Sequence, residues 1–167
     1  MPNAQRRPGS SRAADGGPAP QARSATHFEF SGTVLAFDYG AKRVGVAVGE
    51  CAVGVAHPLT TLHAEGRERQ LAAIAPLIAE WKPGLLVVGS PLHPDGREHE
   101  LTRAARRFAS RLESTFHLPV VLVDERYSSA SADSALREAG VAPSRRRRLL
   151  DPVAAQHILQ AFFDERR

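Results

Sequence analysis

Three acidic residues stand at points of the sequence where the chain is expected to change direction. Asp38 ends an apolar run that a glycine turn follows. Glu125 comes soon after the apolar run 120–123, and Asp151 directly precedes a proline. Carboxylates that share one edge of a sheet repel one another unless cations neutralise them, and Mg²⁺ and Mn²⁺ prefer oxygen ligands. Two such ions can activate water and stabilise the leaving oxygen, so the three acids indicate phosphoryl chemistry if the fold joins them.

Each acid also has a simpler interpretation. Asp38 and Glu125 could be acids in turns that face water, because polar residues such as Asp are common where strands end. Asp124 and Glu125 are neighbours, so in a continuing strand they point to opposite faces and only one of them can reach a shared site. The sequence does not decide which of the two it is.

Asp151 fits two roles. Asp followed by Pro is typical of a helix start, with the acid as N-cap and the proline at the first helical position. It also lies three, four and seven residues before Ala154, Ala155 and Ile158, and so heads the apolar stripe of that helix. Both interpretations, the cap and the site residue, stay open.

Basic residues near the acids are candidates for contact with substrate phosphates. Lys42 and Arg43 closely follow Asp38. The other candidates are Arg126, Arg147 and Arg148, the last two from an arginine run that is also typical of a solvated linker.

Apolar runs predict the strands that must position these residues. A hairpin is expected within residues 34–49, and buried strands at 85–88 and 120–123. A third extended segment, 53–62, contains Pro58, which favours an edge strand or a bulge.

The spacing of apolar residues and the capping residues predict helices at about 65–80 and 98–115, and a third from Ser129 or Ser131 to 139. A basic linker is expected at 141–149, and a last helix begins at Asp151. The inner face of helix 98–115 is expected to hold Leu101, Ala104, Ala105, Phe108 and Leu112, with arginines outside. This order predicts an α/β fold with a five-stranded mixed sheet, a three-strand meander plus two parallel strands, and helices on both faces. Binding sites favour the carboxyl ends of parallel strands in such sheets.

Composition fits one folded domain, assigned to residues 28–167 of this 167-residue chain. Residues 1–27 are rich in Pro, Gly, Ser and Arg without apolar periodicity, and are expected to be a disordered basic tail. The net charge is +4, and the tail holds four arginines and one aspartate, so the folded part is nearly balanced. A polyanion would therefore be attracted by local patches, such as Arg103, Arg106, Arg107 and Arg111 or the run 145–148.

The cysteine content and the hydropathy of the sequence limit the cellular locations that can be expected. The single Cys51 cannot form an internal disulfide, and neither zinc-type spacing nor a long apolar run is present in the sequence. We expect a cytoplasmic protein without a membrane partner.

Four motifs resemble those of the YqgF family, also called RuvX-like, whose members are described as Holliday-junction resolvases or pre-16S rRNA nucleases. The motifs are FDYGAKRVGVA at 37–47, VVGSPL at 87–92 with Asp95-Gly96, DERYSS at 124–129, and DPVAA at 151–155 with ILQ at 158–160. The resemblance implies an RNase H-like fold, with Asp38, Glu125 and Asp151 as acids that bind two Mg²⁺ or Mn²⁺ ions and cleave nucleic acid. It favours the 5′ end of precursor 16S rRNA, and with it a ribosome precursor, over branched DNA.

Two features depart from the family pattern, namely Leu149-Leu150 where a basic residue usually precedes the last acid, and the basic tail. Other functions stay open. A DNA junction resolvase would have to act as a homodimer, and the sequence does not separate a monomer from a homodimer. A nucleic-acid binding or ribosome-assembly factor could keep the fold without cutting. An actin-like ATPase, whose phosphate loop resembles the Asp-Tyr-Gly turn, would need a second domain for which this chain has no room.

Overall fold

A computed structural model describes residues 30–91, 100–124 and 136–166, and the side chains of 144 and 146–150 lie outside the description. The predicted tail, the start of the predicted helix at Ser129 or Ser131, Glu125 and Arg126 also lie outside it. The strands are β1 (Thr33–Tyr39), β2 (Arg43–Glu50), β3 (Val55–His63), β4 (Leu85–Ser90) and β5 (Val120–Asp124). The helices are α1 (Arg67–Trp81), α2 (Glu100–Phe116) and α4 (Pro143–Asp164).

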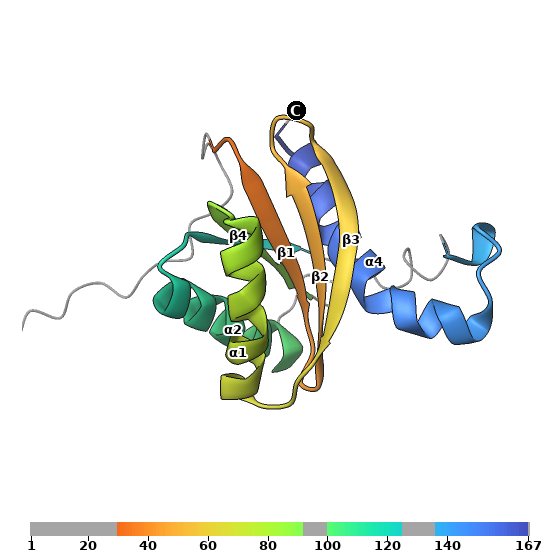
Figure 1. Cartoon of the computed structure of the whole chain (residues 1–167), viewed down its shortest axis with the longest axis horizontal. Helices are drawn as coiled ribbons and strands as arrows, with labels where there is room; N and C mark the ends of the chain where they lie inside the picture. The colour runs from red at the N-terminus through yellow and green to blue at the C-terminus, as the bar shows by residue number, and fades with distance from the viewer. Residues whose placement is uncertain (1–29, 92–99, 125–135, 167) are drawn as a thin grey trace, which may run out of the picture.

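The five strands form one mixed sheet in the order β3-β2-β1-β4-β5 (Figure 1). The first three are an antiparallel meander, β4 is parallel to β1, and β5 is parallel to β4. The predicted sheet is therefore confirmed. The carboxyl ends of β1, β4 and β5 lie at the same end of the sheet, where the turn between β1 and β2 also lies.

Strand β3 lies at the edge of the sheet and carries the irregularity that Pro58 predicts. Val46 pairs with Thr60, but the next residue, Ala47, pairs with Pro58, so the register shifts at this point. Proline has no backbone N–H to donate, and an edge strand with a bulge tolerates that loss.

The two faces of the sheet bury different side chains because alternate residues of a strand point to opposite sides. On β1, Leu35 and Phe37 pack with residues of α1 and α2, such as Ile74 and Phe108. Val34 and Ala36 pack instead against α4, through its residues Ala155, Ile158, Leu159 and Phe162. The sheet thus has α1 and α2 on one face and α4 on the other, as predicted (Figure 1).

Helix α4 begins eight residues earlier than predicted, at Pro143 and not at Asp151. The expected linker 141–149 is therefore mostly helix, and Asp151 is an interior residue and not an N-cap. Arg and Leu are good helix formers, and Pro143 lies at the first turn, where proline is tolerated. Pro152 is inside the helix, where it removes a hydrogen bond and favours a kink. In Figure 1 the first part of α4 projects away from the sheet.

Helix α2 corrects one residue of the predicted inner face. Leu101 is 55% exposed, whereas Thr102, Ala105, Phe108, Ala109 and Leu112 are buried. The Thr102 hydroxyl donates a hydrogen bond to the carbonyl oxygen of Pro91, just beyond β4. This bond places the first turn of α2 beside the carboxyl end of that strand.

Among the three helices described in full, not one has both the length and the apolar character needed to span a membrane.

Candidate active site

Asp38 lies on the face of the sheet that α4 covers. It follows Val34 and Ala36 at intervals of two residues on β1, and both of these pack against α4. Its pairing partner across the antiparallel ladder is Gly45 of β2. Side chains of directly paired residues lie on the same face, so the carboxylate of Asp38 shares its face with the position that Gly45 leaves open.

Helix α4 places Asp151 over this open position. A β-carbon built on Gly45 would overlap the backbone oxygen of Asp151, so only glycine lets the helix come this close. A second glycine of β2 does the same further along, because a β-carbon on Gly49 would lie 2.7 Å from the ring of Phe163. The two glycines fix α4 near the sheet, and Asp38 and Asp151 come together as a result.

Burial and the neighbouring carboxylate both change the acidity of Asp38. Burial, and secondly the negative charge of Asp151, raise the pKa of Asp38 from 3.8 to about 7. Both causes disfavour the ionised form, as expected for an acid that is partly withdrawn from water beside another acid. A bound cation would oppose this shift, because a nearby positive charge favours the ionised form of both acids.

Arg43 supplies one positive charge to this pair. It is the first residue of β2, and its Nε lies 3.6 Å from Oδ2 of Asp151. The arginine side chain is 55% exposed and the aspartate 22%, so water screens the ion pair and its contribution to stability is small. Arg43 therefore keeps an accessible guanidinium group beside Asp151.

A buried glutamine of α1 holds the turn that carries Lys42 and Arg43. The side-chain amide of Gln70 lies within hydrogen-bond distance of the carbonyl oxygens of Gly40 and Ala41, at 2.9 and 3.2 Å, and of Ala64 at 3.1 Å. The backbone N–H of Ala64 in turn donates to the carbonyl of Lys42. Gln70 is only 2% exposed, so its buried side-chain amide needs these hydrogen-bond partners.

The structure also decides the orientation of Asp124, which the sequence leaves open. Val121 and Val123 of β5 pack with the α4 face, whereas Leu122 packs with the α1 and α2 face. Alternation therefore directs Asp124 to the α1 and α2 face, away from Asp38. Asp124 is thereby excluded as a partner of Asp38 and Asp151.

The described residues bring together two of the three predicted acids. Glu125 and Arg126 lie outside them, as do the side chains of Arg147 and Arg148, whose backbone belongs to α4. Lys42 is exposed beside Arg43. Within the described ranges no group of three or more His, Cys, Asp or Glu residues could hold a metal ion.

The donor set nevertheless fits a hard divalent cation. Asp38 and Asp151 offer only oxygen ligands, and Asp38 is a largely buried carboxyl group with a raised pKa. Mg²⁺ and Mn²⁺ take such ligands, commonly with one or two carboxylates and several waters. These two acids are therefore suited to part of a cation site.

Two residues important for this geometry, Gly45 and Gln70, are not identified by the sequence analysis. The signal for Gly45 is present, since Gly45 and Gly49 are four residues apart in one strand and therefore on one face, which indicates close approach of another element. Gln70 has no comparable signal, because its partners are backbone carbonyls distant in the sequence.

The sequence is similar to those of known proteins over most of its length. A family model described as "RuvX: Holliday junction resolvase" matches residues 32–165. A protein of Nitrosospira multiformis named "Putative pre-16S rRNA nuclease" is 57% identical over 136 residues, which cover 81% of this chain and 90% of the relative. A protein of the same name from Methylobacillus flagellatus is 55% identical over 133 residues, covering 80% and 91%.

Solved structures support the fold. The fowlpox virus Holliday junction resolvase aligns with 80% of this chain and 98% of its own, with a TM-score of 0.51 and 10% identity. At this identity the likeness concerns the fold alone, and it agrees with the RNase H-like sheet described above.

Proposed function

The chain belongs to the RuvX family, and we propose that it is a nuclease that hydrolyses phosphodiester bonds with the help of Mg²⁺ or Mn²⁺. The observation that carries the proposal is the meeting of Asp38 and Asp151 on one face, at the carboxyl end of β1. We assign Glu125 as the third acid, because Asp124 is directed to the other face.

The residues have separate tasks in this mechanism. When bound, two divalent ions would supply an activated water and stabilise the leaving oxygen. Asp38, Glu125 and Asp151 would hold these ions through their carboxylate oxygens. Arg43 keeps Asp151 oriented through its ion pair.

Basic side chains would position the substrate. Lys42 is exposed, directly precedes Arg43 in the sequence, and would contact a phosphate near the scissile bond. We propose Arg126, Arg147 and Arg148 as further phosphate contacts. Such contacts hold the backbone in register without reading its sequence.

For the substrate we propose the 5′ end of precursor 16S rRNA, within a ribosome precursor in the cytoplasm. The support is the shared name of the relatives above, which cover four fifths of this chain at 55–57% identity. A DNA four-way junction is the second candidate, and the description of the matching family model favours it. Junction resolution would require two active sites and therefore a homodimer.

A direct test compares both substrates under the same conditions. The purified full-length chain is incubated with Mg²⁺ or Mn²⁺ and either a precursor 16S rRNA fragment or a four-way DNA junction, beside Asp38→Asn. We expect cleavage of the rRNA, its loss in the variant and its loss with a chelator. Preferential cutting of the junction by a dimer would favour the second candidate. Cleavage that persists in Asp38→Asn, or an intact protein that binds RNA and cuts neither substrate, would reject the nuclease in favour of an assembly factor.

A further inference from the structure

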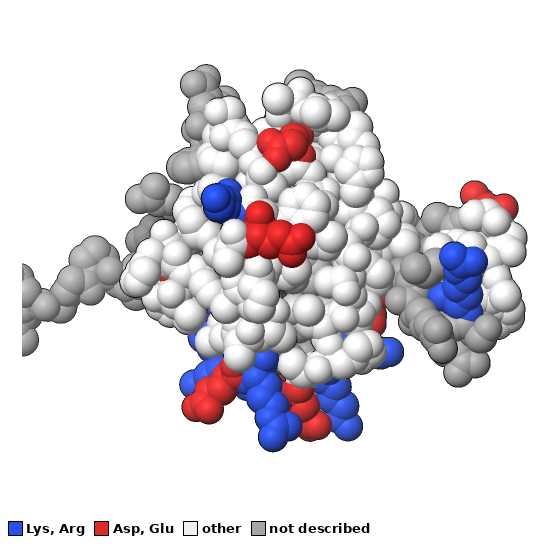
Figure 2. Space-filling view, in the orientation of Figure 1, with Lys and Arg blue, Asp and Glu red and all other residues white. Residues whose placement is uncertain are grey.

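The outer face of α2 carries a stripe of arginines. Arg103, Arg107 and Arg111 are spaced by four residues, so their side chains lie next to one another along the helix. The buried residues Ala105, Phe108 and Leu112 occupy the opposite side. In Figure 2 basic and acidic side chains both gather at the lower end of the visible face, below α1 and α2, while the rest of this face is mostly uncharged.

The stripe meets helix α1 near Tyr39. The Tyr39 ring stacks on Phe108 of α2, with 4.8 Å between ring centroids. Arg111, one turn further along α2, is only partly exposed, and Arg67 begins helix α1. Arg111 interacts electrostatically with Arg67, with Arg107 and with the phenol of Tyr39, so guanidinium groups from two helices lie near one another at this end of the sheet.

These cations are crowded and lack acidic partners within the described parts of the chain. Burial and the charges of Arg67 and Arg107 lower the pKa of Arg111, and the phenol of Tyr39 opposes this shift. Among the described residues, none of the three arginines forms an ion pair. Like charges held close together destabilise a fold, so a bound anion would relieve a repulsion that the protein alone leaves in place.

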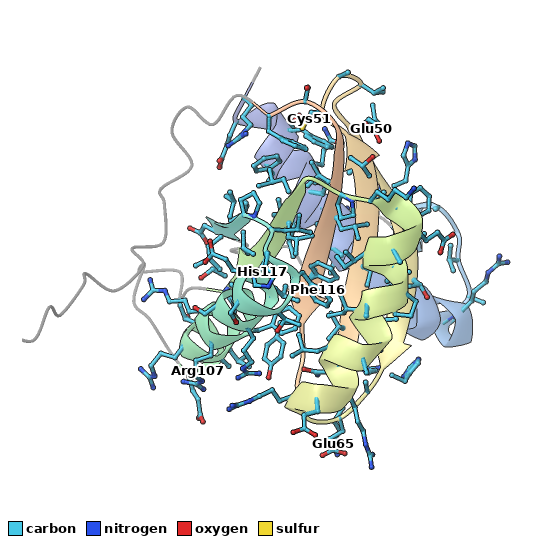
Figure 3. All side chains as sticks on the ribbon, turned by 60° about the vertical axis from the view of Figure 1, so that its left-hand side comes forward. Glu50, Cys51, Glu65, Arg107, Phe116 and His117 are labelled. Carbon is cyan, nitrogen blue, oxygen red and sulfur yellow. The ribbon has the colours of Figure 1, made fainter. Side chains whose placement is uncertain are left out.

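The position of the cluster connects it to the acids. Tyr39 directly follows Asp38 on β1, and its side chain therefore points to the opposite face at the same end of the sheet. Figure 3 shows Arg107 projecting outward from α2, toward the end of the molecule at which Glu65 lies. A chain of phosphates that crosses the end of β1 from the acids would reach this cluster.

We propose that Arg67, Arg107 and Arg111 form a second phosphate-binding surface, which holds the nucleic acid strand beyond the site of cleavage. This inference rests on the proposed function, because it takes the substrate to be a nucleic acid. Arginine suits the task, since its planar fork can donate two hydrogen bonds to one phosphate. We name this surface the α1–α2 arginine cluster.

The test measures binding without cleavage. The full-length chain is kept in EDTA, and its affinity for a fluorescent precursor 16S rRNA fragment is measured by anisotropy from 50 to 250 mM salt. The variants are Arg107→Gln and the double variant Arg67→Gln/Arg107→Gln, which leave the partly buried Arg111 in place. Lys82→Gln is the matched control, because Lys82 is an exposed cation at the opposite end of α1, about 20 Å away by helix rise.

We expect Arg107→Gln to weaken binding by about 5–10-fold at 100 mM salt and to reduce the slope of log affinity against log salt by about 0.7–0.9. The double variant should reduce the slope by about twice as much, on the order of 1.5. Lys82→Gln should stay within about twofold of the parent, and thermal melting should show that all variants are folded.

The outcomes separate this inference from the proposed nuclease function. If Arg107→Gln and the double variant bind RNA like the parent, the arginine cluster is not a phosphate surface, even if the parent cleaves RNA. An equal loss in Lys82→Gln would also reject it, because the effect would then be one of net charge. If binding depends on the cluster but the protein cleaves nothing with Mg²⁺ or Mn²⁺, the cluster stands and the nuclease proposal fails.

Discussion

The backbone of Asp151 lies against Gly45, at a distance that leaves no room for a side chain on the strand. Gly45 is also the pairing partner of Asp38. One glycine therefore determines how close the helix acid comes to the strand acid. The distance between two candidate metal ligands depends on a residue that has no functional group.

We predict that Gly45→Ala separates the two acids. The added methyl group overlaps the Asp151 backbone, so α4 must shift, and we expect a loss of about 2–3 kcal/mol of stability together with at least a tenfold loss of cleavage. Urea unfolding and single-turnover cleavage measure the two effects.

Gly66→Ala is the control for this substitution. A β-carbon there meets nothing within 4 Å, so the cost, of about 1–3 kcal/mol, comes only from a backbone conformation (φ 90°, ψ 154°) that residues other than glycine rarely adopt. Activity should stay near that of the parent. Equal activity losses in the two variants would show that the Gly45 contact has no special role.

The acidity of Asp38 predicts how stability depends on pH in protein without divalent metal. The unfolded chain loses this proton near pH 3.8, whereas the folded chain keeps it up to about pH 7. Unfolding is therefore favoured increasingly as the pH rises from about 4 to 7. This residue alone should lower the free energy of unfolding by an amount on the order of 2–4 kcal/mol over that range.

Asp38→Asn isolates this contribution from those of other groups. The variant should gain stability relative to the parent as the pH rises from 4 to 7, with little further change above 8, as measured by chemical denaturation in EDTA. Mn²⁺ at pH 8 should raise the melting temperature of the parent more than that of the variant. A stability difference that does not change with pH would contradict the raised pKa.

We predict that Gln70 holds the turn at residues 40–42 in place. Gln70→Met keeps the length of the side chain but leaves partly buried carbonyl groups without their side-chain donor, at a cost of about 1 kcal/mol. Amide hydrogen exchange should increase at Ala64 and in the turn, and cleavage should fall because Arg43 is less well placed. Unchanged exchange at Ala64, whose N–H bonds to Lys42, would contradict this role.

Two glutamines of α4 protect the exposed edge of the sheet. The Ala56 N–H donates to Oε1 of Gln160 at 3.1 Å, and the Gln156 side chain donates to the Ala56 carbonyl at 2.9 Å. Gln156→Ala/Gln160→Ala should lower stability by about 1–2 kcal/mol and promote self-association, because unpaired edge strands pair with other chains.

Sedimentation over a range of concentrations tests this prediction. His57→Ala, a change of an exposed side chain on the same strand, should sediment like the parent. If the double glutamine variant behaves in the same way, the edge does not depend on these side chains for its protection.

The predictable parts of this structure are those that periodicity controls. The buried runs of β4 and β5 and the stripe of α4 from Ala154 to Phe162 follow directly from the spacing of apolar residues. The same stripe correctly directs Asp151 toward the sheet. It does so because side-chain direction in a helix is fixed once the buried face is known.

Local rules fail where two of them compete. Asp151-Pro152 satisfies the rule for a helix start, but the preceding run of arginines and leucines continues as helix, with the proline inside it. Leu101 has the right spacing for the inner face but lies in the first turn of α2, where it is 55% exposed. The contacts of Gln70 join segments about 30 residues apart, which no local pattern can show.

The alternation along β1 also limits how this family can tolerate changes in chain length. Inserting or deleting one residue between Val34 and Asp38 would exchange the two faces, and bring Tyr39 to α4 and the acid to α1 and α2. Only changes of two residues would preserve the faces. Natural variation in length should therefore avoid this strand and concentrate in the loops.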